Sequence, residues 1–541
     1  MKYKIIHCIL LMLFGNILSA GAAGYHGKTK TYSVDICIYG GTSAGVIAAY
    51  AARKCGKTVI LIEPGKMIGG MTTGGLGKTD SGNKDAITGL SRQFYKRVAQ
   101  KYGVTGEQWT FEPHIALEVM QDYIAEANIK VLLQTQLVKV RKEGTVITAV
   151  LLKDIRSTDT GLIQVDAKEF LDCTYEGDLM AMAGVSNFVG REDNSRYQET
   201  LNGFQMAAYH QKSGYHQFPD GVSPYKIPGD SASGLVWGVS TDQVRPTGSG
   251  DKQVQAYNFR ICLTDSAANR IPISRPKDYD AGRYVLLARL FKAQPGMRKI
   301  NDYFIWSRMP HHKTDINNRG GFSTDMIGMN YNWPEASYEE REKLFQQAIS
   351  YTKGLLYFMQ TDPRVPDSLQ AFVKKWGYPK DEYQQFDHFT PQLYVREGRR
   401  MIGEYVMTEH NCRGEVTVND GIGMASYGMD SHNCERIVVN GMVKNEGNVE
   451  VGGFPPYPVS YRSLTPKRSE CTNLLVPVCL STSHIAYGSI RMEPVFMVLG
   501  QSAAMAASLA INEKVPVQEI NVQKLQQWLK NDPDLVKGGI E

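Results

Sequence analysis

Two hydrophobic patterns alternate near the start of the chain. Residues 34–39 and 58–62 are short apolar runs, largely β-branched, which is typical of buried strands. Between them, residues 44–54 are mostly small or apolar and are followed by Gly56, which predicts a helix packed closely on a sheet. A strand, a helix and a strand within about thirty residues form a βαβ unit, so the two strands are expected to be parallel.

The α/β pattern continues, stops and returns. The next predicted elements are a helix at 117–127 and strands near 130–139, 146–153 and 170–174. From about 191 to 389 the chain is richer in Tyr, Trp, Pro and His, and its clearest helix covers 337–359. The later predicted elements are a helix near 395–407, a strand at 473–478 and a small-residue helix at 494–510. This order indicates an α/β domain interrupted by an inserted region.

Composition and charge exclude several classes of protein. The chain has 541 residues, which predicts two or three structural units. Hydrophobic residues make up 42% and charged residues 21%, which argues against disorder and against a multi-span membrane protein. The net charge is only +5, from 60 basic and 55 acidic residues without a basic run, so we expect no nucleic-acid partner. The cysteines show no zinc-like spacing, and no metal site is predicted.

The first residues have the pattern of a secretory signal peptide. Lys2 and Lys4 precede an apolar run at 5–18 and small residues at 19–23. We expect residues 1–23 to be removed on export to the periplasm or the exterior of a bacterial cell, with no stable membrane span left afterwards. An uncleaved anchor is the alternative, although the run is short for a membrane span.

A glycine-rich turn joins the first predicted strand to the first predicted helix. The backbone N–H groups of such a turn and the helix N-terminus can face a pyrophosphate. Gly40 permits the tight turn and Gly45 allows close packing, but Thr42 replaces the usual middle glycine. Glu63, at the end of the second strand, can hold the hydroxyls of an adenosine ribose. The predicted dinucleotide-binding residues are Gly40, Gly41, Thr42, Ser43, Ala44, Gly45 and Glu63.

Three further segments extend this pattern toward a flavin. The sequence Gly69-Gly70-Met71 follows Glu63 within a short loop and resembles the FAD-binding signature of glutathione-reductase-like flavoproteins. Residues 170–178 resemble the later strand and turn with which such proteins return to FAD. Pro494 suits the first turn of a helix whose positive end can face the flavin. The resemblance implies further FAD contacts from Gly69, Gly70, Met71, Thr174, Gly177, Asp178, Ser489, Ile490 and Arg491.

Nearly the whole mature chain is similar to a bacterial family of FAD-dependent oxidoreductases. The motifs that carry this resemblance lie at 174–179, 313–317, 393–397, 429–433, 461–464 and 483–494. It implies FAD as the cofactor and an α/β fold: a Rossmann-type, glutathione-reductase-like FAD-binding domain with an inserted α+β substrate domain. The expected divisions are 32–190 for the first part of the FAD-binding domain, 191–390 for the substrate domain, 391–512 for the returning part with the flavin-facing segments, and 513–541 for a C-terminal helical tail.

Four residues are candidates for catalysis. Flavin enzymes mostly move a hydride to or from N5, while the protein positions the substrate and transfers protons. A histidine suits the base, and His432 with Asn433 could share a substrate hydroxyl. His484 precedes the flavin-facing turn, and Arg462 follows a proline-rich loop. A hydrogen-bonded structural histidine is an equally good interpretation of either histidine.

Arg396 and Arg400 would share one face of the predicted helix at 395–407. They could bind an anionic substrate or the FAD phosphates. A salt-bridged face with Glu397 and Glu404 is the alternative.

We therefore expect an exported dehydrogenase or oxidase that transfers a hydride between a small hydroxylated substrate and flavin N5, with an unknown electron acceptor. A sugar or glycoside is the first expectation, because 29 tyrosines and 6 tryptophans offer stacking faces. An amine, an amino acid or a redox-active carrier would also fit. The alternative function is an exported glycan-binding or structural protein that keeps the Rossmann fold but has lost FAD. Thr42 favours this alternative, whereas Glu63, the Gly69-Gly70 pair and the later FAD-like segments oppose it.

Overall fold

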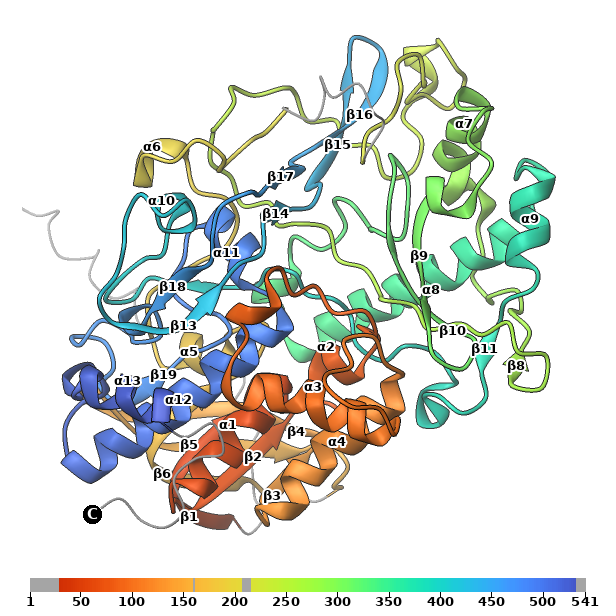
Figure 1. Ribbon diagram of the computed structural model, residues 1–541. Coiled ribbons are helices and arrows are strands. Elements are labelled where there is room, and N and C mark those ends of the chain that lie inside the picture. The colour runs from red at the N-terminus through yellow and green to blue at the C-terminus, as the bar shows by residue number, and fades with distance from the viewer. Residues whose placement is uncertain (1–28, 159–160, 207–215, 532–541) are drawn as a thin grey trace, which may run out of the picture.

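The computed structural model describes residues 29–158, 161–206 and 216–531. The expected signal segment, 1–23, and the last ten residues of the expected tail lie outside the described residues. Figure 1 shows the N-terminal and C-terminal segments side by side in the lower part of the molecule, whereas the middle of the chain forms its upper right part. The lower part is therefore built from both ends of the chain.

A seven-stranded sheet, in the order β3-β2-β1-β6-β5-β4, organises the lower part, and β19 pairs with β6. β1 is parallel to β2 and β6, β2 to β3, and β6 to β19, whereas β4, β5 and β6 are antiparallel. The predicted βαβ unit and its parallel sheet are confirmed. The strands are β1 (Lys30–Tyr39), β2 (Val59–Glu63), β3 (Lys130–Leu133), β4 (Thr135–Glu143), β5 (Val146–Asp154), β6 (Ile163–Asp172) and β19 (Leu474–Leu475).

Helices cover one face of this sheet. Successive side chains of β1 alternate, so Ile36 and Ile38 pack toward the helices while Cys37 and Tyr39 join a second core on the other face. α1 and α12 approach closely because both carry small residues: a Cβ on Gly500 would lie 2.4 Å from the carbonyl oxygen of Ala44. The helices of the lower part are α1 (Ser43–Lys54), α2 (Gly70–Thr73), α3 (Gly89–Lys101), α4 (Pro113–Glu126), α12 (Glu493–Glu513) and α13 (Val522–Asn531).

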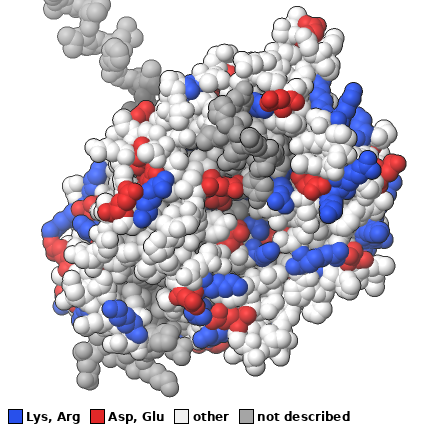
Figure 2. All heavy atoms as spheres, turned by 45° about the horizontal axis from the view of Figure 1, so that its top comes forward, with Lys and Arg blue, Asp and Glu red and all other residues white. Residues whose placement is uncertain are grey.

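α12 is the one helix in the described part of the chain that is long and apolar enough to cross a membrane. The apolar stretch of this helix is 94% buried inside the protein, as expected for a core helix. On the face of the molecule that Figure 2 displays, basic and acidic side chains are interspersed.

The middle of the chain is built around β9, β10 and the long helix α8 (Figure 1). α8 begins at a capping box, in which the Ser337 hydroxyl accepts from the Glu340 N–H and the Glu340 carboxylate accepts from the Ser337 N–H. The elements from 178 to 379 are α5 (Asp178–Met182), β7 (Asn187–Phe188), α6 (Asn194–Tyr197), β8 (Arg270–Ile271), α7 (Val285–Ala293), β9 (Phe304–Met309), β10 (Lys313–Asn318), α8 (Tyr338–Thr361), α9 (Asp367–Val373) and β11 (Tyr378–Pro379).

The returning segment forms hairpins before it rejoins the sheet. These hairpins pack against the middle of the chain; Lys444 binds Asp220 at 2.7 Å, for example. The elements are β12 (Arg400–Met401), α10 (Glu409–Cys412), β13 (Gly421–Ala425), β14 (Met429–Ser431), β15 (Glu435–Val439), β16 (Met442–Glu446), β17 (Val449–Val451), β18 (Tyr457–Ser460) and α11 (His484–Ile490).

Two predictions of local structure were wrong. No helix forms at 395–407; this segment is extended and contains the short strand β12. It runs against the turn after β6, where a Cβ on Gly398 would lie 2.4 Å from the carbonyl oxygen of Tyr175. The strand predicted near 130–139 is two strands, because Gln134 has a positive φ of 52° and breaks it.

Candidate functional site

The first glycine turn has the close approaches that the sequence suggested. Gly40 has a φ of +103°, and a Cβ there would lie 2.6 Å from the carbonyl carbon of Cys173. A Cβ on Gly45 would lie 1.9 Å from the carbonyl oxygen of Gly40. Both positions therefore require glycine, one for its backbone angle and the other for helix packing.

Thr42 does not obstruct this turn. Its φ is −64°, which any residue can adopt, and it is the N-cap of α1. Its hydroxyl donates to the carbonyl oxygen of Cys173 at 2.7 Å and accepts from the N–H of Gly45 at 3.3 Å. The middle position therefore needs no glycine in this chain, and Thr42 is no reason to infer loss of a dinucleotide.

Glu63 lies at the end of β2 beside the turn. Its carboxylate accepts from the N–H groups of Gly41 and Gly65, each at 2.6 Å. Burial raises the pKa of Glu63 to about 7. Each oxygen keeps a lone pair for a further donor, such as a ribose hydroxyl.

The second glycine pair lies against the first turn. The N–H of Gly69 donates to the carbonyl oxygen of Gly41 at 2.6 Å. Gly69 and Gly70 both have positive φ, and a Cβ on Gly70 would lie 2.2 Å from the hydroxyl of Tyr175. That hydroxyl accepts from the N–H of Met71 at 2.9 Å.

The segment after β6, residues 173–178, lies beside the two glycine turns. Thr174 donates its hydroxyl proton to Asp172 at 2.6 Å, and Gly177 has a φ of +70°. Asp178 binds Arg341 of α8 through contacts of 2.5 and 2.8 Å. This ion pair attaches the middle of the chain to the sheet.

These turns border a cleft of about 530 Å³ at the carboxyl ends of β1 and β2, the edge where parallel α/β sheets bind ligands. One face of α8 lines it as well, so the middle of the chain completes the cleft. The lining residues from the predicted set are Gly40, Thr42, Glu63, Gly70, Thr174 and Asp178, and those from α8 include Tyr338, Arg341, Phe345, Ile349 and Lys353. Gly41, Ser43, Ala44, Gly45, Gly69, Met71 and Gly177 are immediate neighbours in these turns.

A second pocket, of about 280 Å³, lies beyond the extended segment at 391–395. Leu393 lines the first cleft and Tyr394, the next residue, lines the second pocket. The pocket wall is mostly polar and includes Asp80, His216, Asn317, Asn318, Tyr394, Tyr427, Asp430, His432 and Glu450. The segment at 391–394 thus borders both the cleft and this pocket.

His432 is the predicted catalytic residue that this pocket contains. Its Nδ1 lies 3.0 Å from Oδ2 of Asp325, and its Nε2 lies 3.5 Å from Oδ2 of Asp430. The second distance is long for a hydrogen bond. Asp430 and His432 both line the pocket, so the contact between Nε2 and Asp430 lies at the pocket wall. Burial alone raises the pKa of Asp430, but His432 and Arg491 outweigh it, and the net shift is downward.

His484 has a different environment. Its Nδ1 lies 2.7 Å from Glu397 and its Nε2 lies 2.9 Å from the Ser431 hydroxyl, so both ring nitrogens have partners. The residue is about 1% exposed and lines neither the cleft nor the second pocket. The structural interpretation fits His484, whereas His432 lines a pocket and its Nε2 has only the long contact to Asp430.

The other predicted catalytic residues, Asn433 and Arg462, do not line the two cavities. Asn433 is buried, and its amide donates to the carbonyl oxygen of His216 at 3.0 Å. Arg462 binds Asp420 at 2.9 Å, and its side chain is 49% exposed. Neither lines the cleft or the second pocket.

The predicted flavin-facing residues of the later segment also lie outside the cleft lining. Ser489 donates to the carbonyl oxygen of Tyr427 at 2.6 Å, and Ile490 is fully buried. Arg491 donates to the Tyr394 hydroxyl at 2.9 Å and to the Asp430 carbonyl oxygen at 3.1 Å, so it supports the second pocket from behind.

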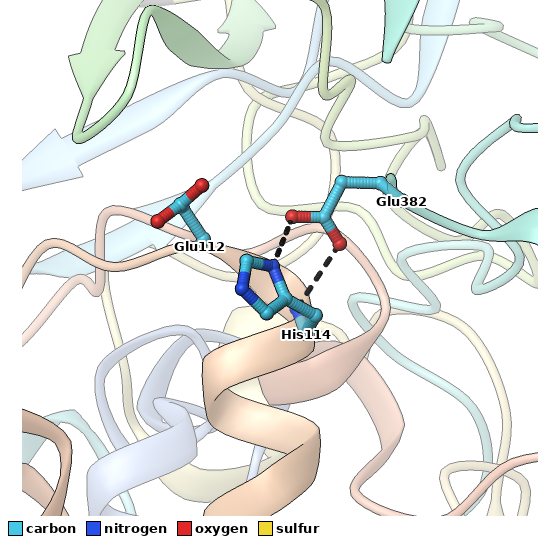
Figure 3. Close-up of side chains that lie close together, drawn as sticks. All are labelled: Glu112, His114 and Glu382. Carbon is cyan, nitrogen blue, oxygen red and sulfur yellow. Dashed lines mark hydrogen bonds and ion pairs between the residues drawn. The ribbon is translucent and has the colours of Figure 1, made fainter. Parts of the chain in front are cut away.

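A cluster with ligand-like geometry lies at a separate place. One atom each of Glu112, His114 and Glu382 lie within 4.8 Å of one another, and Figure 3 shows Glu382 directed at the imidazole of His114. The buried Lys313 ammonium already binds Glu112 at 2.6 Å, Glu382 at 2.7 Å and Asp381 at 2.8 Å. Its three protons thus have three carboxylate acceptors, so the chain itself supplies the cation of this cluster.

Sequence reasoning missed two buried carboxyl groups. Glu493, at the start of α12, accepts from Ser43 at 2.5 Å, Thr72 at 2.8 Å and Tyr175 at 2.6 Å, so it ties α12 to both glycine turns. Burial raises the pKa of Glu493. Asp325, the partner of His432, lies in a loop without any motif. Glu493 stands in a quoted motif beside Pro494, but no local signal marked Asp325.

A family model described as FAD dependent oxidoreductase matches residues 35–529 of this sequence. The match includes both glycine turns, Glu63 and His432. The sequence has no match among curated proteins.

Several solved structures resemble parts of the chain. L-proline dehydrogenase from P. horikoshii is 20% identical over 31% of this chain and 26% of that chain, with a TM-score of 0.19. Glycerol-3-phosphate dehydrogenase from Bacillus halodurans, complexed with FAD, is 16% identical over 31% and 41%, with a TM-score of 0.24. THI4 from Thermovibrio ammonificans is 17% identical over 31% and 71%, with a TM-score of 0.23. The matched part thus spans about a quarter of the first of these proteins.

Proposed function

The chain belongs to the FAD dependent oxidoreductase family, and from this we propose that it transfers a hydride between a small hydroxylated substrate and the flavin, with His432 as the base. FAD is the cofactor, and the protein is an FAD-dependent oxidoreductase. The observation that carries the proposal is the position of His432. His432 lines a polar pocket, and the segment at 391–394 borders both this pocket and the cleft with the glycine turns. From the contact of its Nε2 with Asp430, another lining residue, we infer that the Nε2 edge is the one directed at the pocket.

The residues of the cleft fit FAD. The close approaches at Gly40 and Gly70 leave no room for a side chain, so the backbone itself borders the cavity. We propose that the N–H groups at the start of α1 bind the diphosphate and that Glu63 binds the adenosine ribose hydroxyls. When bound, FAD supplies the hydride chemistry of its isoalloxazine ring.

His432 would handle the proton of the substrate hydroxyl. Oxidation of an alcohol releases a hydride and a proton, and a base near the hydroxyl accelerates the reaction. Nε2 of His432 accepts the proton from the pocket side. Asp325 at 3.0 Å and Asp430 at 3.5 Å then stabilise the positive charge of the imidazolium.

The lining of the pocket supports an uncharged polyhydroxylated substrate, with a sugar or glycoside as the first proposal. Asn317, Asn318 and Tyr427 supply donors and acceptors for hydroxyl groups. Asp80, Asp430 and Glu450 are also present, and among the described residues that line the pocket none is Lys or Arg. An anionic substrate is therefore disfavoured, while a cationic amine is the second proposal.

We also propose the finer division of the chain and its export. The parallel sheet, β19 and α12 would form a glutathione-reductase-like FAD-binding domain from 32–190 and 391–512, with 191–390 as the inserted substrate domain and 513–541 as the tail. Residues 1–23 would direct export to the periplasm or the exterior. Because no twin-arginine pair precedes the apolar run, the chain would cross the membrane unfolded and bind FAD afterwards. The N-terminal sequence of the secreted protein tests the cleavage.

An anaerobic titration tests the proposed reaction. Purified mature protein loaded with FAD is mixed with a panel of sugars and glycosides, and the visible flavin absorption is recorded. Bleaching by a sugar supports the proposal. If amines bleach the flavin and sugars do not, the substrate class is an amine. If no hydroxylated compound bleaches a fully loaded protein, the proposed function is wrong.

A further inference from the structure

We propose that Asp325 is the positioning residue that keeps the ring proton of His432 on Nδ1, so that Nε2 is available to the substrate. This inference rests on the proposed function, in which His432 is the base. Asp325 is 3% exposed and lies 3.0 Å from Nδ1 through its Oδ2. A carboxylate accepts hydrogen bonds and cannot donate one, so the proton between these two atoms belongs to Nδ1.

Arg396 holds Asp325 in this role. Its guanidinium lies 2.9 Å from Oδ1 of Asp325. The same guanidinium is anchored by donation to the backbone carbonyl of Ala256 and to Asn318 at 3.3 Å. Burial alone raises the pKa of Asp325, but Arg396 and His432 outweigh it and the net shift is downward. Asp325 is therefore ionised, and its two oxygens have two different partners: Oδ2 accepts from His432, and Oδ1 forms the ion pair with Arg396.

The opposite tautomer has a competing acceptor within reach. With its proton on Nε2, His432 would donate toward Asp430, which lies 3.5 Å away and also contacts Arg491 at 3.4 Å. The other ionisable ring nearby is His216, whose centroid lies 6.3 Å from that of His432. The shorter contact to Asp325 decides the tautomer in favour of Nδ1–H.

Replacing Asp325 by Asn would reverse this choice. The amide oxygen of Asn would accept from Arg396, so its N–H groups would face Nδ1 of His432. Nδ1 would then have to accept, and the ring proton would move to Nε2 with Asp430 as its acceptor. The shape of the site would be kept while the base toward the pocket would be lost.

The first test needs no substrate. In ¹⁵N-histidine-labelled, FAD-loaded protein, the signals of His432 among the 11 histidines are assigned with His432→Gln. We expect the neutral ring to carry its proton on Nδ1, and on Nε2 in Asp325→Asn. A proton on Nε2 in the unsubstituted protein overturns the proposal, even if the variant does not fold and even if no substrate has been found.

The second test measures the rate of flavin reduction by a substrate. We expect Asp325→Asn to slow reduction by about 100-fold or more, the usual range for loss of a general base, with FAD binding unchanged. The matched control is Glu112→Gln, which removes a buried carboxylate that likewise binds a cation and a histidine. The control is expected to change the rate by less than about 3-fold. Equal losses in both variants would make Asp325 merely structural and overturn the proposal.

Discussion

The clusters around His432 and around Lys313 each combine a cation, carboxylates and a histidine, and of these two only the first has a histidine that lines the second pocket. In the first, Arg396 binds Asp325, and Asp325 binds His432 at the wall of the second pocket. In the second cluster, the Lys313 ammonium binds three carboxylates, those of Glu112, Asp381 and Glu382, so all its protons have acceptors. Glu382 also binds His114 (Figure 3).

The comparison teaches that ligand-like spacing is a weak sign of function. The Lys313 cluster has the tighter geometry and would pass for a metal site if its lysine were ignored. It joins the start of α4 to β10 and to the loop after β11, so it fastens distant segments together. In the His432 cluster, the Nε2 edge has only the long 3.5 Å contact to Asp430, and the proposed function assigns the proton transfer to this edge. We therefore expect substitutions in the His432 cluster to change the reaction rate, and substitutions in the Lys313 cluster to change the stability of the protein.

The largest effect is expected for His432→Gln. Loss of the base should slow flavin reduction by about 100- to 10,000-fold, or about 2.7–5.5 kcal/mol of activation free energy. Stopped-flow reduction of the FAD-loaded variant measures this, and its flavin spectrum checks that the cofactor still binds. A rate within about 3-fold of the unsubstituted protein would remove His432 from the mechanism.

Lys313→Met should act on stability instead. It leaves the buried carboxylates of Glu112 and Glu382 without their cation, which typically costs about 3–5 kcal/mol of the free energy of unfolding. Denaturant unfolding measures the loss. The exposed Lys375→Met is the control, expected to change the free energy by less than about 0.5 kcal/mol. A stable Lys313 variant with a strongly reduced rate would contradict the division between the two clusters.

His484→Gln separates the two candidate histidines. Because both ring nitrogens of His484 are bonded to Glu397 and Ser431, its loss should cost about 1–3 kcal/mol of stability. The reduction rate of the folded variant should fall by less than about 10-fold. If the variant is as stable as the parent but cannot be reduced, His484 belongs to the reaction after all.

The smallest effect concerns pH. The hydrogen bond to Glu382 raises the pKa of His114 in the folded protein. The stabilisation of the folded state by protonated His114 is therefore complete below the pKa that His114 has in the unfolded chain, and it is lost as pH rises through the pKa in the folded protein. Because the side chain is 37% exposed, we expect a decline of less than about 1 kcal/mol between pH 6 and pH 8. Thermal unfolding across this range should show the decline, and His114→Asn should remove it. An unchanged slope in the variant would assign the dependence to another group.

The local sequence pattern was enough to predict the first glycine turn. Gly40, Gly45 and Glu63 belong to one βαβ unit, and adjacent parallel strands bring the end of β2 to the turn. The replacement by Thr42 could not be interpreted from sequence, because its meaning depends on a backbone angle and on a contact with Cys173, 131 residues away.

The segment at 395–407 shows the limit of periodicity. Arg396 and Arg400 are spaced like neighbours on a helix face, yet each is buried in an extended segment with its own carboxylates. Similar residues four positions apart indicate a helix only where interactions between neighbouring residues determine the backbone conformation. Here the partners of Arg396 include Ala256, 140 residues away, and such distant contacts override propensity.

The sequence by itself determined the βαβ unit, the glycine turns and the acidic residue beside them, because strand periodicity and tight turns depend on neighbouring residues. It also marked His432 and His484, but as equals. Only the tertiary structure distinguished them, because the bond from His432 to Asp325 spans 107 residues and the pocket beside it is lined by separate segments. A turn is a local property of the chain, whereas a histidine at the wall of a pocket takes its place only once distant segments have packed together.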